Sequence, residues 1–300
     1  MSKINEFNLE VTNRIIELME LSKQTNRPFL SWDKTGNSAH MPVNFSSKSN
    51  YSGVNVLILI HAMMMGGFKT NQWMTMKQAN FMGYKVIKGS KPTKIAFYKP
   101  YVKNALSDDE LEEKKVISFL KPYSVFNVEQ LEGFEVSEPV TEDLCGENDN
   151  VLAEQYLSIA NIKYGLDRAC YIPSRDEINM PSKSQFSDYS GFYNVALHEL
   201  THWTAHKSRL SRTLSNYSES KSSYAYEELV AEIGSAFLCA DVGILQSTQE
   251  DHAQYLNSWI AVLKNDTSMV FKAAKDAQKA FNFIQEQAKE KLATATPLAS

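Results

Sequence analysis

The segment Val195–Thr204 constrains this chain more than any other, because residues 198 to 202 read His-Glu-Leu-Thr-His. The segment is expected to be helical. His198 and His202 then lie one turn apart on the same face, so two imidazole nitrogens can reach one metal ion. Glu199 projects about 100° round the helix from His198, where it could take a proton from a water that the metal activates. The pattern predicts a divalent-metal site with Glu199 as the catalytic residue.

Two histidines are not a complete metal site, and a third protein ligand is needed. His206 continues the four-residue stripe, but eight residues of helix rise roughly 12 Å from His198, too far to share an ion with bonds of about 2 Å. Glu228 and Glu232 are better placed, because they lie four residues apart on one face of a second expected helix, Tyr224–Phe237. The element Glu-x-x-Ala-Glu that they define resembles the Glu-x-x-Ala-Asp element of gluzincin peptidases.

That resemblance implies that Glu228 is the third metal ligand and that Glu232 accepts a hydrogen bond from a ligand imidazole. The two roles could be exchanged. Glu227 points away from this face and is expected to be solvated. The expected cofactor is Zn²⁺, with Mn²⁺ as an alternative. Tyr224 or Tyr226 could stabilise an oxyanion, although either could equally be a packing residue.

Charge is distributed unevenly along the 300 residues, whose net charge is −4. Residues 1–103 carry 14 Lys and Arg against 5 Asp and Glu, a net of +9, whereas residues 104–300 carry 17 against 30, a net of −13. A basic half joined to an acidic half indicates that the first half meets a polyanion. Length and charge together predict two domains, 1–136 and 151–300, joined by an acidic linker at 137–150.

Hydrophobic spacing predicts an α+β fold with two domains. In the first domain we expect helices over Ile4–Gln24, Asn55–Met65 and Trp73–Met82, a hairpin of Tyr84–Gly89 with Lys94–Lys99, and a later strand over Tyr123–Val128. In the second we expect helices over Leu152–Asn161, Asp251–Lys264 and Ser268–Lys291, beside the two metal-site helices, and short strands over Arg168–Ile172 and Asp176–Met180. The second domain is therefore mainly helical, with a small sheet.

Lysines alternate with aromatic residues in the predicted sheet of the first domain. Cations that follow phosphates and rings that stack on bases are the features of a single-strand binder. The predicted DNA contacts are Lys85, Lys88, Lys91, Lys94 and Lys99 with Trp32, Tyr51 and Trp73. The alternative is that the aromatic residues belong to the core and the lysines only solubilise an edge strand.

Five motifs follow one another along the first half of the chain: Pro42-x-Asn44, Tyr51-x-Gly53-x-Asn55, Trp73-x-Thr75-x-Lys77-Gln78-Ala79, Gly83-x-x-Val86-x-Lys88-Gly89 and Phe126-Asn127-x-Glu129-Gln130. Together they resemble the N-terminal domain of ArdC-type antirestriction proteins, which is shared with TraC-type primases. The runs Tyr189–Thr204 and Tyr224–Phe237 resemble the zincin-like metallopeptidase domain that follows it in the same family. Trp32 departs from the pattern, since relatives often have a Pro-Trp pair there.

The resemblance implies a protein of a conjugative plasmid that binds single-stranded DNA without strong sequence preference and protects entering DNA from host restriction. Double-stranded DNA is a second candidate partner. Two alternatives remain open. In one, the metal is structural and the DNA-binding half acts alone. In the other, the chain is a zinc-dependent metalloprotease that acts on DNA-associated proteins and is recruited by its first domain.

Cysteine usage and hydropathy indicate where the protein acts. Cys145, Cys170 and Cys239 form no close pair, which suits a reducing compartment. The chain shows no signal peptide, and its longest apolar run, Val56–Met65, is far too short to cross a membrane. We therefore expect a cytoplasmic protein with no membrane partner.

Overall fold

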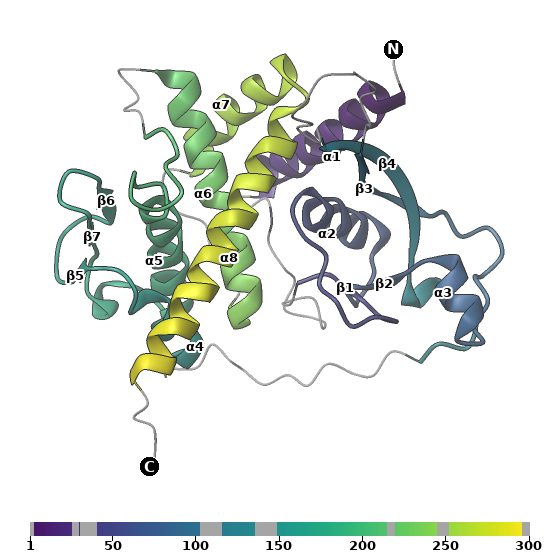
Figure 1. The fold of residues 1–300 in the computed structure, drawn as a ribbon, viewed down its shortest axis with the longest axis horizontal. Coiled ribbons are helices and arrows are strands. Elements are labelled where there is room, and N and C mark those ends of the chain that lie inside the picture. The colour runs from purple at the N-terminus through teal and green to yellow at the C-terminus, as the bar shows by residue number, and fades with distance from the viewer. Residues whose placement is uncertain are drawn as a thin grey trace, which may run out of the picture.

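A computed structural model describes residues 3–25, 30, 41–102, 116–135, 149–214, 220–244 and 252–295. The fold is α+β with two domains, as the sequence predicted, and a single long helix, α8, passes between them (Figure 1). Most of the predicted acidic linker, residues 137–148, lies outside the described residues, so the domain boundaries stay predictions. No helix among the described ranges is both long enough and apolar enough to span a membrane.

The first domain wraps a curved hairpin around one buried helix (Figure 1). Its helices are α1 (Lys3–Thr25), α2 (Val54–Gly66) and α3 (Met76–Phe81), and its strands are β1 (Val43–Asn44), β2 (Gln72–Met74), β3 (Thr93–Val102) and β4 (Val116–Asn127). The sheet order is β1-β2-β4-β3, with β1 parallel to β2 and the other pairs antiparallel. Helix α2 is apolar on all sides and ends at Gly67, whose left-handed conformation (φ 65°) lets its N–H cap the helix.

Two predicted elements of this domain were wrong. The expected helix Trp73–Met82 is a strand followed by a short helix, because Thr75 caps α3 and forms a capping box with Gln78. The expected strand Tyr84–Gly89 makes a single bridge, from Val86 to Leu131, and β3 pairs with β4 instead. Turn residues Gly83 and Gly89, both with positive φ, flank the segment and limit any longer pairing.

The second domain follows its predicted order. Its helices are α4 (Val151–Leu157), α5 (Tyr189–Trp203), α6 (Lys221–Val242), α7 (His252–Asn265) and α8 (Met269–Ala295). A three-stranded sheet, ordered β5-β7-β6, consists of β5 (Ile162–Lys163), β6 (Cys170–Ile172) and β7 (Glu177–Asn179). Two short 3₁₀ helices, at Val128–Gln130 and Lys183–Gln185, complete the described elements. Helix α5 packs against both α6 and β6, which brings the predicted metal ligands together.

One hydrophobic core runs through both domains. Buried side chains of α1 and α2 join the same cluster as those of α5, α6, α7 and α8. Polar contacts reinforce the junction: the Thr12 hydroxyl donates to the Thr267 carbonyl at 3.0 Å, and the Gly53 N–H donates to the Gln278 side-chain oxygen at 2.8 Å. Helix α8 thus contacts α2 of the first domain as well as α6 of the second.

Candidate metal centre and nucleic-acid surface

Helix α5 carries both predicted histidine ligands. The Asp188 side chain caps its N-terminus by accepting a hydrogen bond from the Gly191 N–H. One turn of the helix separates His198 from His202, so their rings are neighbours, with centroids 4.8 Å apart and one edge toward the face of the other. The side chain of His198 is buried and that of His202 largely so, with 7% and 11% of their surface exposed. The predicted pairing of these two histidines is therefore present.

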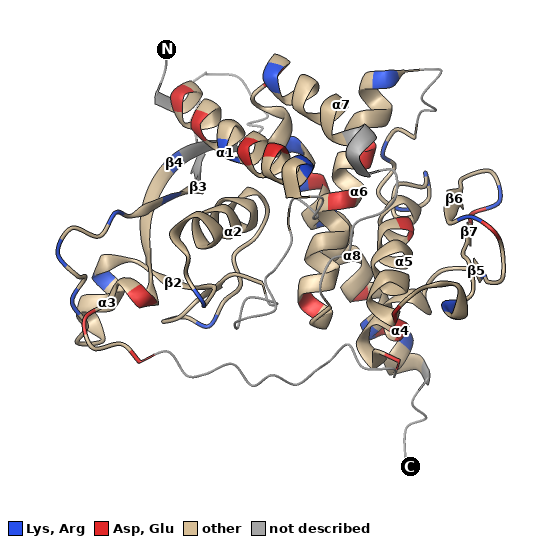
Figure 2. Cartoon of the chain, turned by 180° about the vertical axis from the view of Figure 1, so that it is seen from behind, with Lys and Arg blue, Asp and Glu red and all other residues tan. Residues whose placement is uncertain are grey.

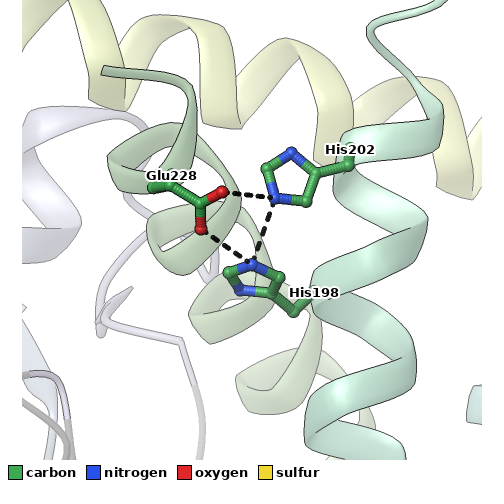
Figure 3. Close-up of side chains that lie close together, drawn as sticks. All are labelled: His198, His202 and Glu228. Atoms are coloured by element: carbon green, nitrogen blue, oxygen red, sulfur yellow. Dashed lines mark hydrogen bonds and ion pairs between the residues drawn. The ribbon is translucent and has the colours of Figure 1, made fainter. Parts of the chain in front are cut away.

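Glu228 of α6 completes the group, as Figure 3 shows. Its Oε2 lies 3.6 Å from His198 Nε2 and its Oε1 lies 3.6 Å from His202 Nε2, while the two Nε2 atoms are 3.2 Å apart. Donors of a tetrahedral zinc ion at bonds of about 2.0–2.1 Å stand about 3.3–3.4 Å from one another. The triangle of donors therefore has the size that a divalent metal ion requires, and its nitrogen and carboxylate atoms suit such an ion.

Electrostatics in the centre favour a cation. Burial alone lowers the pKa of His202, but the carboxylates of Glu228 and Glu227 outweigh it and raise that pKa to about 9. Burial alone raises the pKa of Glu228, whereas the two imidazoles hold it well below its usual range. Carboxylates that attract positive charge so strongly are ready to accept a divalent ion in place of protons.

A glycine brings the two metal-site helices close together. An added Cβ on Gly234 of α6 would meet the Thr201 Cγ2 of α5 at 2.6 Å. Thr201 is completely buried, and its hydroxyl donates to the Leu197 carbonyl at 2.9 Å, so it cannot move aside cheaply. The distance from Glu228 to the histidines depends on this close approach.

We therefore expect Gly234→Ala to destabilise the protein by about 1–3 kcal/mol, because it overpacks a closed interface. It should also weaken metal binding, since α6 moves Glu228 away from α5. Urea unfolding and a Zn²⁺ titration check the two effects. Adding Thr201→Ser removes the opposing methyl group and should restore much of the stability and of the metal affinity. A Gly234→Ala variant with the stability and metal affinity of the wild type would contradict the prediction.

The two neighbouring glutamates differ from what was expected of them. Glu227 was predicted to be solvated, and that was wrong: it is 4% exposed, its Oε1 lies 3.2 Å from His202 Nδ1, and Arg212 donates to both of its oxygens. The Glu232 Oε2 lies 3.6 Å from His198 Nδ1, on the side predicted for it. Sequence reasoning missed Glu227 because the arginine that buries it comes from a loop.

Glu199 is held beside the donors rather than among them. Its Oε2 accepts the Tyr171 backbone N–H at 2.7 Å, which ties the helix to strand β6. Its side chain is half-buried. Tyr226 is not available for an oxyanion, because its hydroxyl donates to Asp276 at 3.0 Å, whereas Tyr224 stays a prediction. The hydrogen bond from the Tyr171 N–H engages one of the two carboxylate oxygens of Glu199.

The predicted DNA contacts fall into four groups. Lys85, Lys88, Lys91 and Lys94 are exposed, and Figure 2 shows basic positions along the segment between α3 and β3. Trp73 is completely buried with its indole N–H donating to Asn71, so it is wrong as a stacking residue. Tyr51 is half-buried and its hydroxyl accepts a hydrogen bond from Asn44. Trp32 and the side chain of Lys99 lie outside what the structure describes.

Another aromatic pair, outside the predicted DNA contacts, stands on the surface of the hairpin. Phe97 and Tyr123 are 49% and 44% exposed, and their ring centroids are 5.3 Å apart. Phe97 lies opposite Lys121 across the β3–β4 ladder, so Phe97, Lys121 and Tyr123 share a face. Lys121 Nζ lies 5.7 Å from the centre of the Tyr123 ring. The presence of aromatic residues at alternate positions was the available signal, but it could not separate core from surface.

Comparisons with known proteins agree with this geometry. Residues 149–276 match the family model of a zincin-like metallopeptidase, and residues 5–126 match that of the N-terminal domain of the anti-restriction factor ArdC. Fold and site together thus define a protein with a zincin-like metallopeptidase domain. The chain belongs to the ArdC family of antirestriction proteins.

Individual proteins are similar to this chain over most of its length. The metal-free crystal structure of the antirestriction protein ArdC from plasmid R388 has 34% identity and a TM-score of 0.75, covering 94% of this chain and 98% of that one. Its Mn(II)-bound structure gives 32% identity and a TM-score of 0.69 over the same shares. The uncharacterised protein y4eC of Sinorhizobium fredii is 32% identical, covering 92% of this chain and 91% of that protein.

The DNA primase TraC of Escherichia coli is 34% identical over 296 residues. That match covers 93% of this chain but only 27% of the primase. The likeness to TraC therefore concerns one segment of a much longer protein.

Proposed function

We propose that this chain is the antirestriction protein of a conjugative plasmid, which binds single-stranded DNA without strong sequence preference and protects entering DNA from host restriction. The observation that carries the proposal is the similarity to the R388 ArdC protein over nearly the whole chain, in both domains. The metal centre is part of the proposal: His198, His202 and Glu228 hold a divalent ion, Zn²⁺ or Mn²⁺. A cytoplasmic location follows from the same function.

DNA binding is assigned to a surface that we call the basic hairpin surface: Lys85, Lys88, Lys91, Lys94, Phe97, Lys121 and Tyr123. Lysines on the segment before β3 neutralise phosphates, whichever bases they carry. The exposed rings of Phe97 and Tyr123 offer a stacking face, which every base can use. Lys94 also lies 4.0 Å from Glu10 of α1, so part of its charge is balanced within the protein. Phe97 and Tyr123 take the place of the buried Trp73 in this proposal.

The metal centre supports a second candidate function, peptide hydrolysis on DNA-associated proteins. A divalent ion held there would supply Lewis acidity to a peptide carbonyl and to water. Glu199 directly follows His198 on α5, and as the general base it would accept a proton from water and deliver it to the leaving amine. The Tyr171 N–H fixes one oxygen of Glu199 and leaves the other for that exchange. The hydrogen bond from the Tyr171 N–H to Glu199 is the observation that favours peptide hydrolysis as a second function.

We expect the double variant Lys88→Glu with Lys91→Glu to weaken binding of a single-stranded oligonucleotide. Each lost phosphate contact should reduce the slope of log K against log salt by about 0.7, so both together by roughly 1.4. Fluorescence anisotropy across a salt series measures both the affinity and the slope. Phe97→Ala with Tyr123→Ala should weaken binding with an unchanged slope, because stacking releases no counterions.

The matched control carries the same charge change on the other domain. Lys275 and Lys289 are exposed on α8, and their replacement by Glu should have a much smaller effect on DNA affinity. Equal weakening by the two double variants would show that only net charge matters and would contradict the assigned surface. No binding by the wild-type chain would remove the DNA-binding proposal itself.

A further inference from the structure

A buried chain of contacts lies behind His202, on the ring nitrogen that faces away from Glu228. The Glu227 Oε1 is 3.2 Å from His202 Nδ1. Arg212 grips that carboxylate with two donors, Nη2 to Oε1 at 2.8 Å and Nε to Oε2 at 3.0 Å. Three side chains thus form one continuous path from a loop to a predicted metal ligand.

Local structure fixes where Arg212 can reach. The chain folds back over the end of α5, because the Leu210 N–H donates to the Thr204 carbonyl and the Ser211 N–H to the His206 carbonyl, both at 3.1 Å. Ser211 turns the chain in the left-handed region, with a φ of 51°. This reversal brings Arg212 alongside the last turn of α5.

Arg212 is held there by further contacts. Its Nη2 donates to the Thr201 carbonyl at 2.9 Å and its Nη1 to the Thr204 hydroxyl at 2.8 Å. The guanidinium therefore caps the end of the helix that carries both histidines. It ties that helix to Glu227, which directly precedes Glu228 in α6.

Burial makes the geometry specific. The side chains of Arg212, Glu227 and His202 are only 8%, 5% and 11% exposed. A bidentate pair of arginine and carboxylate has a narrow range of geometries, so Glu227 has little freedom to turn. Since a buried ion pair is weak evidence for a stabilising role, its position against a ligand histidine is the feature that needs a reason.

We propose that Glu227 is a positioning residue for the metal centre and that Arg212 fixes it in place. Glu227 accepts a hydrogen bond from His202 Nδ1–H. This contact selects the tautomer whose unprotonated Nε2 lies on the side of Glu228 and His198, where the metal ion would bind. The corresponding contact of His198, with Glu232, is longer at 3.6 Å, so His202 is the more tightly oriented ligand. The inference rests on the proposed metal site and adds to it the group that prepares one ligand.

The test is metal affinity of the full chain, measured by competition between the protein and a chelator for Zn²⁺ and for Mn²⁺. Glu227→Gln keeps the size of the side chain and removes its charge, and should weaken binding by about 10- to 100-fold. Arg212→Lys keeps the charge but loses the bidentate pair of hydrogen bonds to Glu227, and should also weaken metal binding, to a smaller extent. The absorption spectrum of the Co²⁺-loaded variants should change as well, because His202 is no longer held in one orientation.

A charge-neutral variant separates positioning from simple electrostatics. Glu227→Gln combined with Arg212→Gln leaves the total charge of the pair unaltered, and should still bind metal more weakly than the wild type. Arg209→Gln is the matched control: Arg209 is 8% exposed in the same loop and pairs with Asp176, which touches neither histidine. It should leave metal affinity unchanged even if it lowers stability.

The outcomes are distinct. A wild-type chain that binds none of the three ions would refute the proposed metal site. Normal wild-type binding with an unaffected Glu227→Gln variant would overturn the positioning role alone. Recovery of wild-type affinity in the charge-neutral variant would assign the effect to charge, and would overturn it too. Weaker metal binding in both the Glu227→Gln variant and the charge-neutral double variant, with the metal affinity of Arg209→Gln unchanged, supports the inference.

Discussion

Replacement of Glu228 by alanine is expected to abolish tight binding of a divalent metal while leaving both domains folded. Glu228 supplies both oxygens that face the two Nε2 atoms, each at 3.6 Å. A structural zinc site with four ligands is worth about 10–16 kcal/mol, so one ligand accounts for roughly 3 kcal/mol and its loss for about 100-fold or more in affinity. Isothermal titration with Zn²⁺ and Mn²⁺ measures the change.

Thermal unfolding provides a second measurement of the effect of Glu228→Ala on metal binding. A metal ion present at about 100 times its dissociation constant should stabilise the wild type by about 2.7 kcal/mol, and the Glu228→Ala variant hardly at all. Asp241→Asn is a suitable control, because Asp241 is a carboxylate at the other end of α6 that bonds Tyr156 and Gln285. A Glu228→Ala protein that still binds as tightly as the wild type would show that the three donors are not the site.

Glu199→Gln should separate the two candidate functions. Glu199 is not one of the three donors, and a glutamine can still accept the Tyr171 N–H, so metal affinity and single-strand binding should be unchanged. Hydrolysis of a peptide or protein substrate should fall by about 10²- to 10⁴-fold, because no carboxylate remains to transfer the proton. Cleavage of labelled casein and of a peptide library, with the metal-loaded wild type beside it, checks this.

Antirestriction in cells then decides which function matters. If the chain protects by binding, Glu199→Gln should protect incoming plasmid DNA as well as the wild type during conjugation into a restricting host. If it protects by hydrolysis, protection should disappear together with cleavage. Wild-type cleavage that persists undiminished in the variant would show that Glu199 is not the proton-transfer group.

The sequence was sufficient to predict the pair of histidine donors, because helix periodicity fixes it locally, whereas Glu228 was chosen by resemblance and its role was left exchangeable with that of Glu232. His198 and His202 share a face in any helix that contains both, and Glu228 lies on the next amphipathic helix of the order that zincins use. The geometry between the helices could not be predicted, because it depends on the contact of Gly234 with Thr201, two residues that carry no chemical signal.

Failures of the prediction have a common physical origin in tertiary burial. Glu227 looked like a surface residue of an amphipathic helix until Arg212 was seen to cover it from a loop. Trp73 is an aromatic residue of the kind that stacks on bases, yet its side chain is completely buried in the core. Phe97 and Tyr123 are exposed although Ile95 and Val125, two residues away on the same face of the β3–β4 ladder, are buried, and periodicity does not contain that information.

The shared core has a consequence for how such a protein can be inherited and recombined. Helix α8 covers parts of both domains, so a break after residue 136 would uncover the apolar sides of α1 and α2 that α7 and α8 now shield. A cut at that point would leave two partners that aggregate rather than two usable modules. The similarity to TraC, which spans 93% of this chain within a far longer primase, likewise covers both domains together.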